Sequence, residues 1–221
     1  MLFLYISNLH SDDFIRMNCH LYNYCSNNPV RYVDTDGCDA KDIFFILIRD
    51  DNSKYSLSDK SYRALDIISF KNYKTGDFFN LHHVQSYVSH SDYPASNTLE
   101  AYMNVFSIQY LGNNKKDGHA LFGGFVSNYG GPVFNVQNAY TKGNGITDEY
   151  GQIIPPEGDD TTPIRVHSNY NLNEDREVNM ASGGCPMYNY EQADDFAAFL
   201  ERNGVEPGDK IFGFIKEYFE P

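Results

Sequence analysis

The feature that most constrains the fold is a continuous apolar run, Ile43-Phe44-Phe45-Ile46-Leu47-Ile48, which lies between Asp42 and Arg49-Asp50-Asp51. A short apolar run between charged residues is typical of a strand that is buried on both faces. A chain of 221 residues is long enough to build one sizeable core around such a strand. The run therefore predicts a fully buried strand within one main domain.

Several other segments favour a sheet-rich domain. Alternating apolar and polar residues predict strands at 102–111, 119–126, 133–140 and 211–215. The content of 15% aromatic residues, with 18 Tyr and no Trp, also suits a β-rich domain. Residues 143–160 are rich in Gly, Pro and acidic residues, and they predict a long surface loop.

The segment after residue 188 predicts one clear helix. Asn189 is suited to cap it, with Gln192 in the capping-box position, and Gly204 is suited to end it. The apolar stripe of this helix consists of Phe196, Phe199 and Leu200. Residues 56–68 predict a second helix. The fold class predicted from the residues alone is mainly β with some α.

A cysteine in a tight turn, Ser182-Gly183-Gly184-Cys185, follows a histidine, His167, at the end of an alternating segment. Sulfur attacks as the thiolate, so a nucleophilic cysteine works best beside a base and near backbone N–H donors. His167 is the candidate base, and the N–H groups of Gly184 and Cys185 are candidates to hold a substrate oxyanion. Ser182 either hydrogen-bonds the active-site backbone or shapes the turn. Together these residues predict a thiol enzyme.

Other residues are candidates for substrate contacts. Strand alternation places Arg165 on the face of His167, where it either binds a substrate carboxylate or forms a surface ion pair. His119 and Tyr129 are candidates to line the cleft. Because Cys19, Cys25 and Cys38 lack the spacing of a zinc site, no metal and no other cofactor is predicted. Cys185 is then the lone thiol of the main domain, which fits a reactive group better than a disulfide.

The order His167-Ser168 … Ser182-Gly183-Gly184-Cys185 resembles the active-site motif of the L,D-transpeptidase catalytic domain. Members of that family cut or exchange the peptide crosslinks of bacterial peptidoglycan. The resemblance implies that Cys185 is the nucleophile, His167 its base and the Ser168 backbone carbonyl the group that orients the imidazole, in a twisted β-sandwich-like fold. The family usually has an aliphatic residue and then Arg or Asn after the cysteine, where this chain has Pro186-Met187.

A second resemblance covers residues 21–37, Leu-Tyr-Asn-Tyr-Cys-Ser-Asn-Asn-Pro-Val-Arg-Tyr-Val-Asp-Thr-Asp-Gly. This segment is similar to the closing segment of the Rhs/YD-repeat core, a β-cage that carries variable C-terminal toxins. In that family the Asp-containing end belongs to a self-cleavage site, and Thr35 stands here where the family usually has proline. The two resemblances predict a remnant of the Rhs core at 1–38 and an L,D-transpeptidase-like toxin domain at 39–221.

Charge and hydropathy limit the partners. The net charge of −13 opposes a polyanionic partner, and the longest basic run is Lys115-Lys116, so no nucleic acid is predicted. The apolar start, Met1–Ile6, lacks the basic flank and cleavage site of a signal peptide, and no segment is long enough to span a membrane. Delivery to the periplasm or cell wall of a target cell would then use a secretion machine or the parent Rhs polypeptide. The resemblance also implies a cognate immunity protein.

The favoured hypothesis is a secreted Rhs-associated toxin that acts on peptidoglycan stem peptides through a Cys-His acyl-enzyme. Water as acceptor makes it an L,D-carboxypeptidase, and an amine makes it a transpeptidase or D-amino-acid exchanger. Two alternatives remain open. One is a non-enzymatic structural or binding domain of a surface Rhs protein, with Cys185 buried and inert. The other is a cysteine protease or deamidase that acts on proteins.

Overall fold

The computed structural model describes residues 39–50, 56–58, 61–88, 95–101, 105–114, 130–154, 163–170, 177–178 and 182–218. All of them belong to one compact unit, Cys38–Pro221. The Rhs-like segment 21–37, with the rest of the predicted remnant 1–38, lies outside the described residues. The predicted strand at 119–126 also lies outside them.

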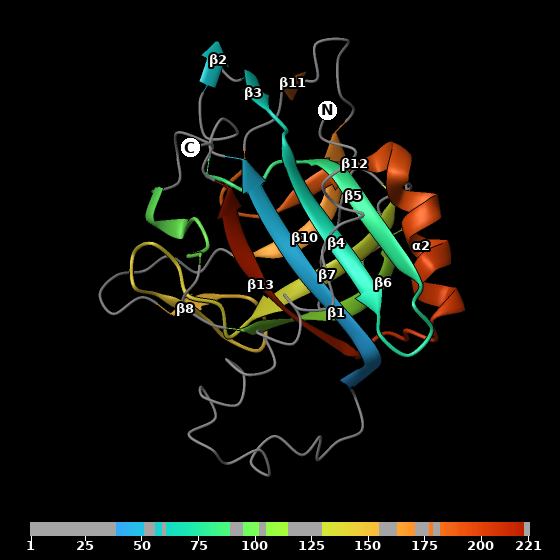
Figure 1. The fold of residues 1–221 in the computed structure, drawn as a ribbon. Coiled ribbons are helices and arrows are strands. Elements are labelled where there is room, and N and C mark those ends of the chain that lie inside the picture. The colour runs from blue at the N-terminus through green and yellow to red at the C-terminus, as the bar shows by residue number, and fades with distance from the viewer. Residues whose placement is uncertain are drawn as a thin grey trace. The chain divides into compact units, whose positions relative to one another are not determined.

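Eight strands form one mixed sheet, in the order β12-β10-β7-β6-β13-β1-β4-β5 (Figure 1). Their bounds along the sheet are β12 (Met187–Asn189), β10 (Arg165–Tyr170), β7 (Gly131–Gln137), β6 (Phe106–Asn114), β13 (Lys210–Tyr218), β1 (Asp39–Asp50), β4 (Asp66–Asn72) and β5 (Phe78–Val84). With a single α-helix among the described residues, the fold is mainly β, as predicted.

The apolar run at 43–48 lies in β1, an inner strand that pairs parallel with β13 and antiparallel with β4. Ile43, Phe45, Ile46 and Leu47 are buried, so the predicted strand is confirmed, but it is fully buried on one face only. Phe44 and Ile48 alternate onto the face opposite Phe45 and Leu47 and keep partial exposure.

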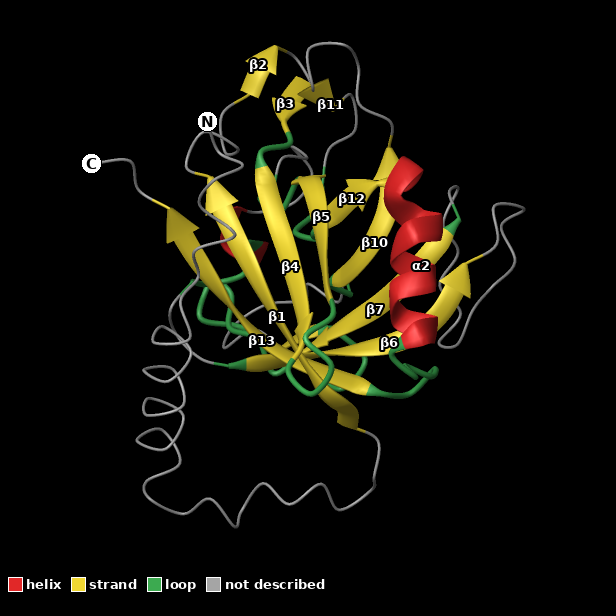
Figure 2. Ribbon diagram, turned by 45° about the vertical axis from the view of Figure 1, so that its right-hand side comes forward, coloured by secondary structure: helices red, strands yellow, loops and turns green. Residues whose placement is uncertain are grey.

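The two edges of the sheet meet. Beyond the end of β5, Gln85 forms an antiparallel bridge with Met187 of β12. The Gln85 N–H donates to the Met187 carbonyl at 2.9 Å, and the Met187 N–H donates to the Gln85 carbonyl at 2.8 Å. This bridge closes the strand order into a ring, and Figure 2 shows β12 beside β5. The buried side chains inside the ring form one apolar core.

One helix covers this interior beside β5 and β7 (Figure 2). It is α2 (Ala193–Arg202), preceded by a 3₁₀ turn, η7 (Tyr190–Gln192). The side chain of Asn189 accepts the Glu191 N–H at 3.2 Å, and Gly204 follows the helix with a φ of +70°. Phe196 of α2 packs its ring against Phe70 of β4 with centroids 4.9 Å apart. The predicted helix is confirmed, with its first turn in the 3₁₀ form.

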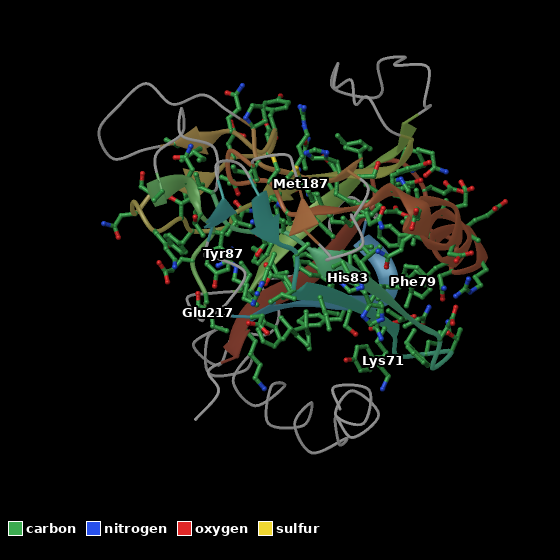
Figure 3. The ribbon with its side chains drawn as sticks, turned by 90° about the horizontal axis from the view of Figure 1, so that it is seen from above. Lys71, Phe79, His83, Tyr87, Met187 and Glu217 are labelled. Atoms are coloured by element: carbon green, nitrogen blue, oxygen red, sulfur yellow. The ribbon has the colours of Figure 1, made fainter. Side chains whose placement is uncertain are left out.

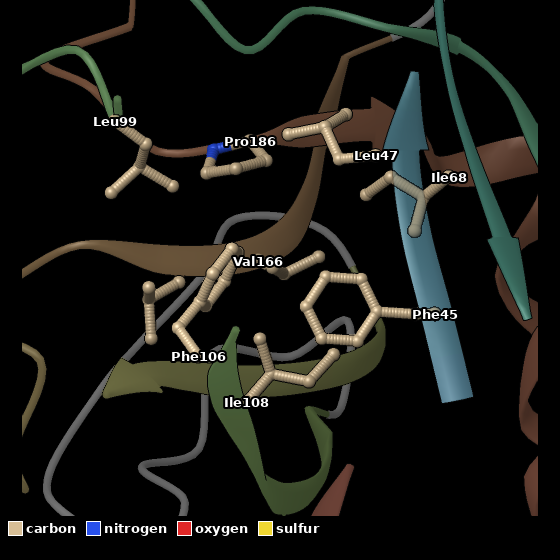
Figure 4. A pocket seen from close by; sticks show the side chains of 9 residues that line it. Phe45, Leu47, Ile68, Leu99, Phe106, Ile108, Val166 and Pro186 are labelled. Atoms are coloured by element: carbon tan, nitrogen blue, oxygen red, sulfur yellow. The ribbon is translucent and has the colours of Figure 1, made fainter. Parts of the chain in front are cut away.

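The interior holds a cavity of about 10 Å³ (Figure 4). Its lining is wholly apolar and consists of Phe45, Leu47, Ile68, Leu99, Phe106, Ile108, Val136, Val166 and Pro186. A space of this size and character is a packing void and not a binding site. Pro186 directly follows Cys185, so the cysteine turn forms part of the wall of the core.

A charged side chain is buried at one end of the ring. Arg49 of β1 is 0% exposed. Its Nε donates to the Ser86 hydroxyl at 2.9 Å, and its two Nη atoms donate to the carbonyls of Leu99 at 2.6 Å and Ser86 at 3.1 Å. Asp66, also buried, accepts the Ser86 hydroxyl at 2.6 Å. Glu217, labelled in Figure 3, lies 3.8 Å from an Arg49 nitrogen. The group ties β1, β4 and the segments around Ser86 and Leu99 together.

Two predictions about local structure were wrong. The described part of 56–68 is not helical; it contains β2 (Ser56–Ser58), β3 (Ser61–Arg63) and the start of β4. β3 also pairs with β11 (Glu177–Val178), so tertiary pairing overrides the local pattern. Residues 143–154 of the loop predicted at 143–160 instead contain a small hairpin, β8 (Ile146–Thr147) and β9 (Ile153–Ile154), with its turn bonded to the side chain of Asp148, and the rest of that loop lies outside the described residues.

Candidate active site

Cys185 lies just before β12, in a turn that its neighbours fix. The Ser182 hydroxyl donates to the Cys185 carbonyl at 2.8 Å and accepts the Gly184 N–H at 3.0 Å. Ser182 therefore both hydrogen-bonds the backbone at Cys185 and shapes the turn. Gly184 has a φ of +125°, and a Cβ on it would lie 2.9 Å from the Asn97 carbonyl oxygen. Only glycine fits there without displacing the backbone around Asn97.

This geometry changes one expectation about the oxyanion. The Gly184 N–H was expected to hold it together with the Cys185 N–H, but in this conformation it donates to Ser182. The physical reason is that the tight turn satisfies its own buried N–H group. The Cys185 N–H is the donor that the hypothesis retains. Gly183 is half-buried and completes the turn.

The sulfur of Cys185 contacts the backbone at the start of β10. The Arg165 N–H donates to Sγ at 3.4 Å, and Sγ lies 3.6 Å from the Pro163 carbonyl oxygen. Cys185 is a half-buried free cysteine. Pro163 was not among the predicted site residues, because nothing in the sequence indicates which backbone carbonyl faces the thiol.

Cys185 lies before β12, beside β10, the strand that carries His167. Val166 lines the internal cavity, so Arg165 and His167 alternate onto the opposite face of β10. The sulfur of Cys185 lies at the edge of β10, where the Arg165 N–H and the Pro163 carbonyl meet it. His167 is the register partner of Met187 in the parallel pair of β10 and β12. Cys185 precedes Met187 and is thus a diagonal neighbour of His167 across the two strands. The sulfur of Cys185 makes its hydrogen bonds with backbone groups of Arg165 and Pro163 rather than with His167.

The imidazole of His167 is 7% exposed, and its tautomer follows from one contact. Nδ1 lies 3.0 Å from the backbone oxygen of Ser168. A carbonyl oxygen only accepts, so this contact places the proton on Nδ1 and leaves the lone pair on Nε2. The hydroxyl of Ser168 donates to the Gly130 carbonyl, which anchors the residue that orients the ring.

Burial makes His167 a neutral base. It lowers the pKa of His167 to about 4; the Ser168 carbonyl opposes this, and the positive charge of Arg165 adds to it. Burial also raises the pKa of the Cys185 thiol, while the N–H and the charge of Arg165 lower it. A nucleophilic cysteine is expected to be more acidic than a free thiol, and the structure differs because burial outweighs the donors. The resting pair is a neutral thiol with a neutral imidazole.

Arg165 is half-buried beside the thiol, and its side chain is held by a residue that sequence analysis did not single out. Its Nε donates to Asn135 Oδ1 at 3.0 Å. Arg165 and Asn135 are register partners in β10 and β7. Asn135 falls within the strand predicted at 133–140, but its role depends on strand register, which the local sequence does not indicate.

The remaining predicted contacts, His119 and Tyr129, lie outside the described residues. Within the described ranges, no group of three or more His, Cys, Asp or Glu side chains is placed to hold a metal ion. No helix in the part of the chain that the structure describes is long and apolar enough to cross a membrane. Comparison with known protein families, curated proteins and solved structures finds no match to this chain.

Proposed function

We propose that the domain is a cysteine acyl-transfer enzyme of the L,D-transpeptidase type that acts on peptidoglycan stem peptides. The supporting observation is that a half-buried thiol lies at the edge of β10, and that this strand carries a buried imidazole oriented by the carbonyl of the next residue. This combination of nucleophile, base and orienting group is what acyl transfer through a thioester requires. The proposal includes the β-sandwich-like fold type of that family and delivery to the cell wall of a target cell.

The reaction would proceed in two halves. Nε2 of His167 takes the thiol proton as the sulfur attacks the carbonyl carbon of a peptide bond to a diamino acid. The Cys185 N–H holds the oxyanion that forms. The C–N bond then breaks, the imidazolium gives its proton to the leaving amine, and a thioester remains. Water resolves this thioester in a carboxypeptidase, and an amine resolves it in a transpeptidase or exchanger.

The test is digestion of purified sacculi by the whole chain, followed by analysis of the released muropeptides. We expect altered stem peptides with the wild type and none with Cys185→Ala. His167→Ala should slow the reaction about 10²–10⁴-fold, the usual contribution of a positioned general base. His82→Ala is the matched control, because His82 is a partly buried histidine of another strand, β5, and should leave the rate unchanged.

Two other outcomes correspond to the alternatives. The raised pKa of the half-buried Cys185 thiol favours an inert structural residue, as in a non-enzymatic binding domain. Unchanged sacculi together with a Cys185 that iodoacetamide does not label would support that domain. Unchanged sacculi with a thiol that is labelled would point to a cysteine protease or deamidase acting on proteins.

A further inference from the structure

A cationic residue of β10 lies next to the nucleophile and on the strand face that carries the base. Arg165 contacts the Cys185 sulfur through its N–H at 3.4 Å, and it alternates onto the same face as His167. Its guanidinium is tied to the neighbouring strand by the bond of 3.0 Å from Nε to Asn135 Oδ1. Strand pairing thus fixes both ends of Arg165, its backbone at the sulfur and its side chain at Asn135.

A thiolate in this half-buried position needs a nearby positive charge. The buried imidazole of His167 does not supply one at neutral pH, because its pKa lies at about 4. Of the charged side chains that the structure describes, Arg165 is the one whose field acts on the thiol. Arg165 is itself half-buried, so water screens its charge less than it would at an exposed site.

We propose that the guanidinium of Arg165 is the electrostatic partner of the Cys185 thiolate and that Asn135 is its positioning residue. This role rests on Cys185 being the nucleophile of the proposed function. It differs from the role of Arg165 as a binder of substrate carboxylate, because it acts on the enzyme before any substrate arrives.

The cation acts on the two groups in opposite directions. It favours loss of the proton from Cys185, and it disfavours a proton on His167. The thiol becomes easier to ionise while His167 becomes a weaker base, so the contribution of Arg165 to the reaction lies in the thiolate that it stabilises. As the proton moves from sulfur to Nε2, Arg165 stabilises the negative sulfur that precedes attack.

The experiment measures the rate of iodoacetamide labelling of Cys185 against pH in the whole folded chain. Iodoacetamide is neutral and has no carboxylate, so a substrate-binding role of Arg165 would not affect it. Arg165→Met removes the charge but keeps the backbone N–H at the sulfur. We expect the midpoint of its labelling profile to rise by about one pH unit, the lower end of the effect of a nearby opposite charge. Arg165→Lys should stay close to the wild type, and Asn135→Ala should lie between them.

Arg202→Met is the matched control, because it removes one positive charge from α2, where Arg202 pairs with Asp77 at 2.6 Å. Its midpoint should equal that of the wild type. An unchanged midpoint in Arg165→Met, or an equal rise in Arg202→Met, would overturn the proposal. If Arg165→Met does not fold, Arg165→Gln removes the same charge and keeps a polar donor for Asn135. The labelling experiment uses no wall substrate. A rise in the labelling midpoint that is confined to the Arg165 variants therefore supports the role of Arg165 even if sacculi remain undigested. Conversely, digestion of sacculi without such a rise would support the proposed function but not the role of Arg165.

Discussion

His167 is a buried base whose ordinary protonation near neutral pH the fold prevents. Its pKa of about 4 in the folded chain lies below the 6.5 of a free histidine. Between pH 4 and pH 6.5, His167 is protonated in the unfolded chain and neutral in the folded chain. A lowered pKa therefore contributes stability that is present above pH 6.5 and is lost as the pH falls through 4.

We predict that the free energy of unfolding falls by about 3 kcal/mol between pH 7 and pH 4 through His167 alone. Urea unfolding at a series of pH values measures this loss. His167→Gln, which cannot take up a proton, should remove that part of the pH dependence. His82→Ala is the comparison: burial also lowers the pKa of His82, but His82 is less buried than His167, so a smaller part of the pH dependence should be lost with it. A pH profile of His167→Gln parallel to the wild type would show that His167 does not carry the effect.

At the scale of elements, the sequence predicted the secondary structure correctly where the residues of one segment determine its conformation. The buried run of β1 and the capped helix α2 followed from apolar spacing, Asn189 and Gly204. The prediction of a Cys-His pair rests on a glycine turn and a strand histidine, which are local features. The pairing of Asn135 with Arg165 and the helix wrongly expected at 56–68 depend on strand register and tertiary pairing, which no short window contains.

The role of Arg49 also depends on tertiary contacts, because the sequence shows only a charged residue at the end of an apolar run. The hydrogen bonds of Arg49 hold the segments around Ser86 and Leu99. Both segments lie next to the cysteine turn. The first reaches it through the Gln85–Met187 bridge, and the second through the close approach of Gly184 to Asn97. Burial lowers the pKa of Arg49, whereas the negative charge of Asp66 raises it. Its charge is thus compensated inside the ring.

We predict that Arg49→Met lowers the free energy of unfolding by about 3–5 kcal/mol, because it leaves Asp66 and two carbonyls buried without this partner. Urea unfolding measures the change. Lys142→Met is the control, since Lys142 also lies 3.8 Å from Glu217 but its side chain is 41% exposed. That exposed pair should contribute less than about 1 kcal/mol. Equal losses in the two variants would contradict a special role for the buried cation.

At the scale of the whole molecule, the net charge of −13 sets which partners can approach. Long-range repulsion opposes encounter with polyanions, whereas the amines of stem peptides are attracted. We predict that the chain leaves DNA and RNA intact, is toxic when targeted to the periplasm of a Gram-negative cell, and is harmless in the cytoplasm. Growth under both routes, with Cys185→Ala alongside, tests this. Toxicity from the cytoplasm alone that persists in Cys185→Ala would refute both the wall substrate and the thiol mechanism.

The closed ring also determines when the site can exist during synthesis. β13 is the last strand of the sheet in sequence order, yet it lies between β6 and β1, and it pairs parallel with the first strand. Such distant pairings form late in folding. Until β13 has left the ribosome, the ring stays open and the strands around the cysteine turn lack their final support. The strands that position Cys185 and His167 are thus complete only after Tyr218, the last residue of β13, has been made.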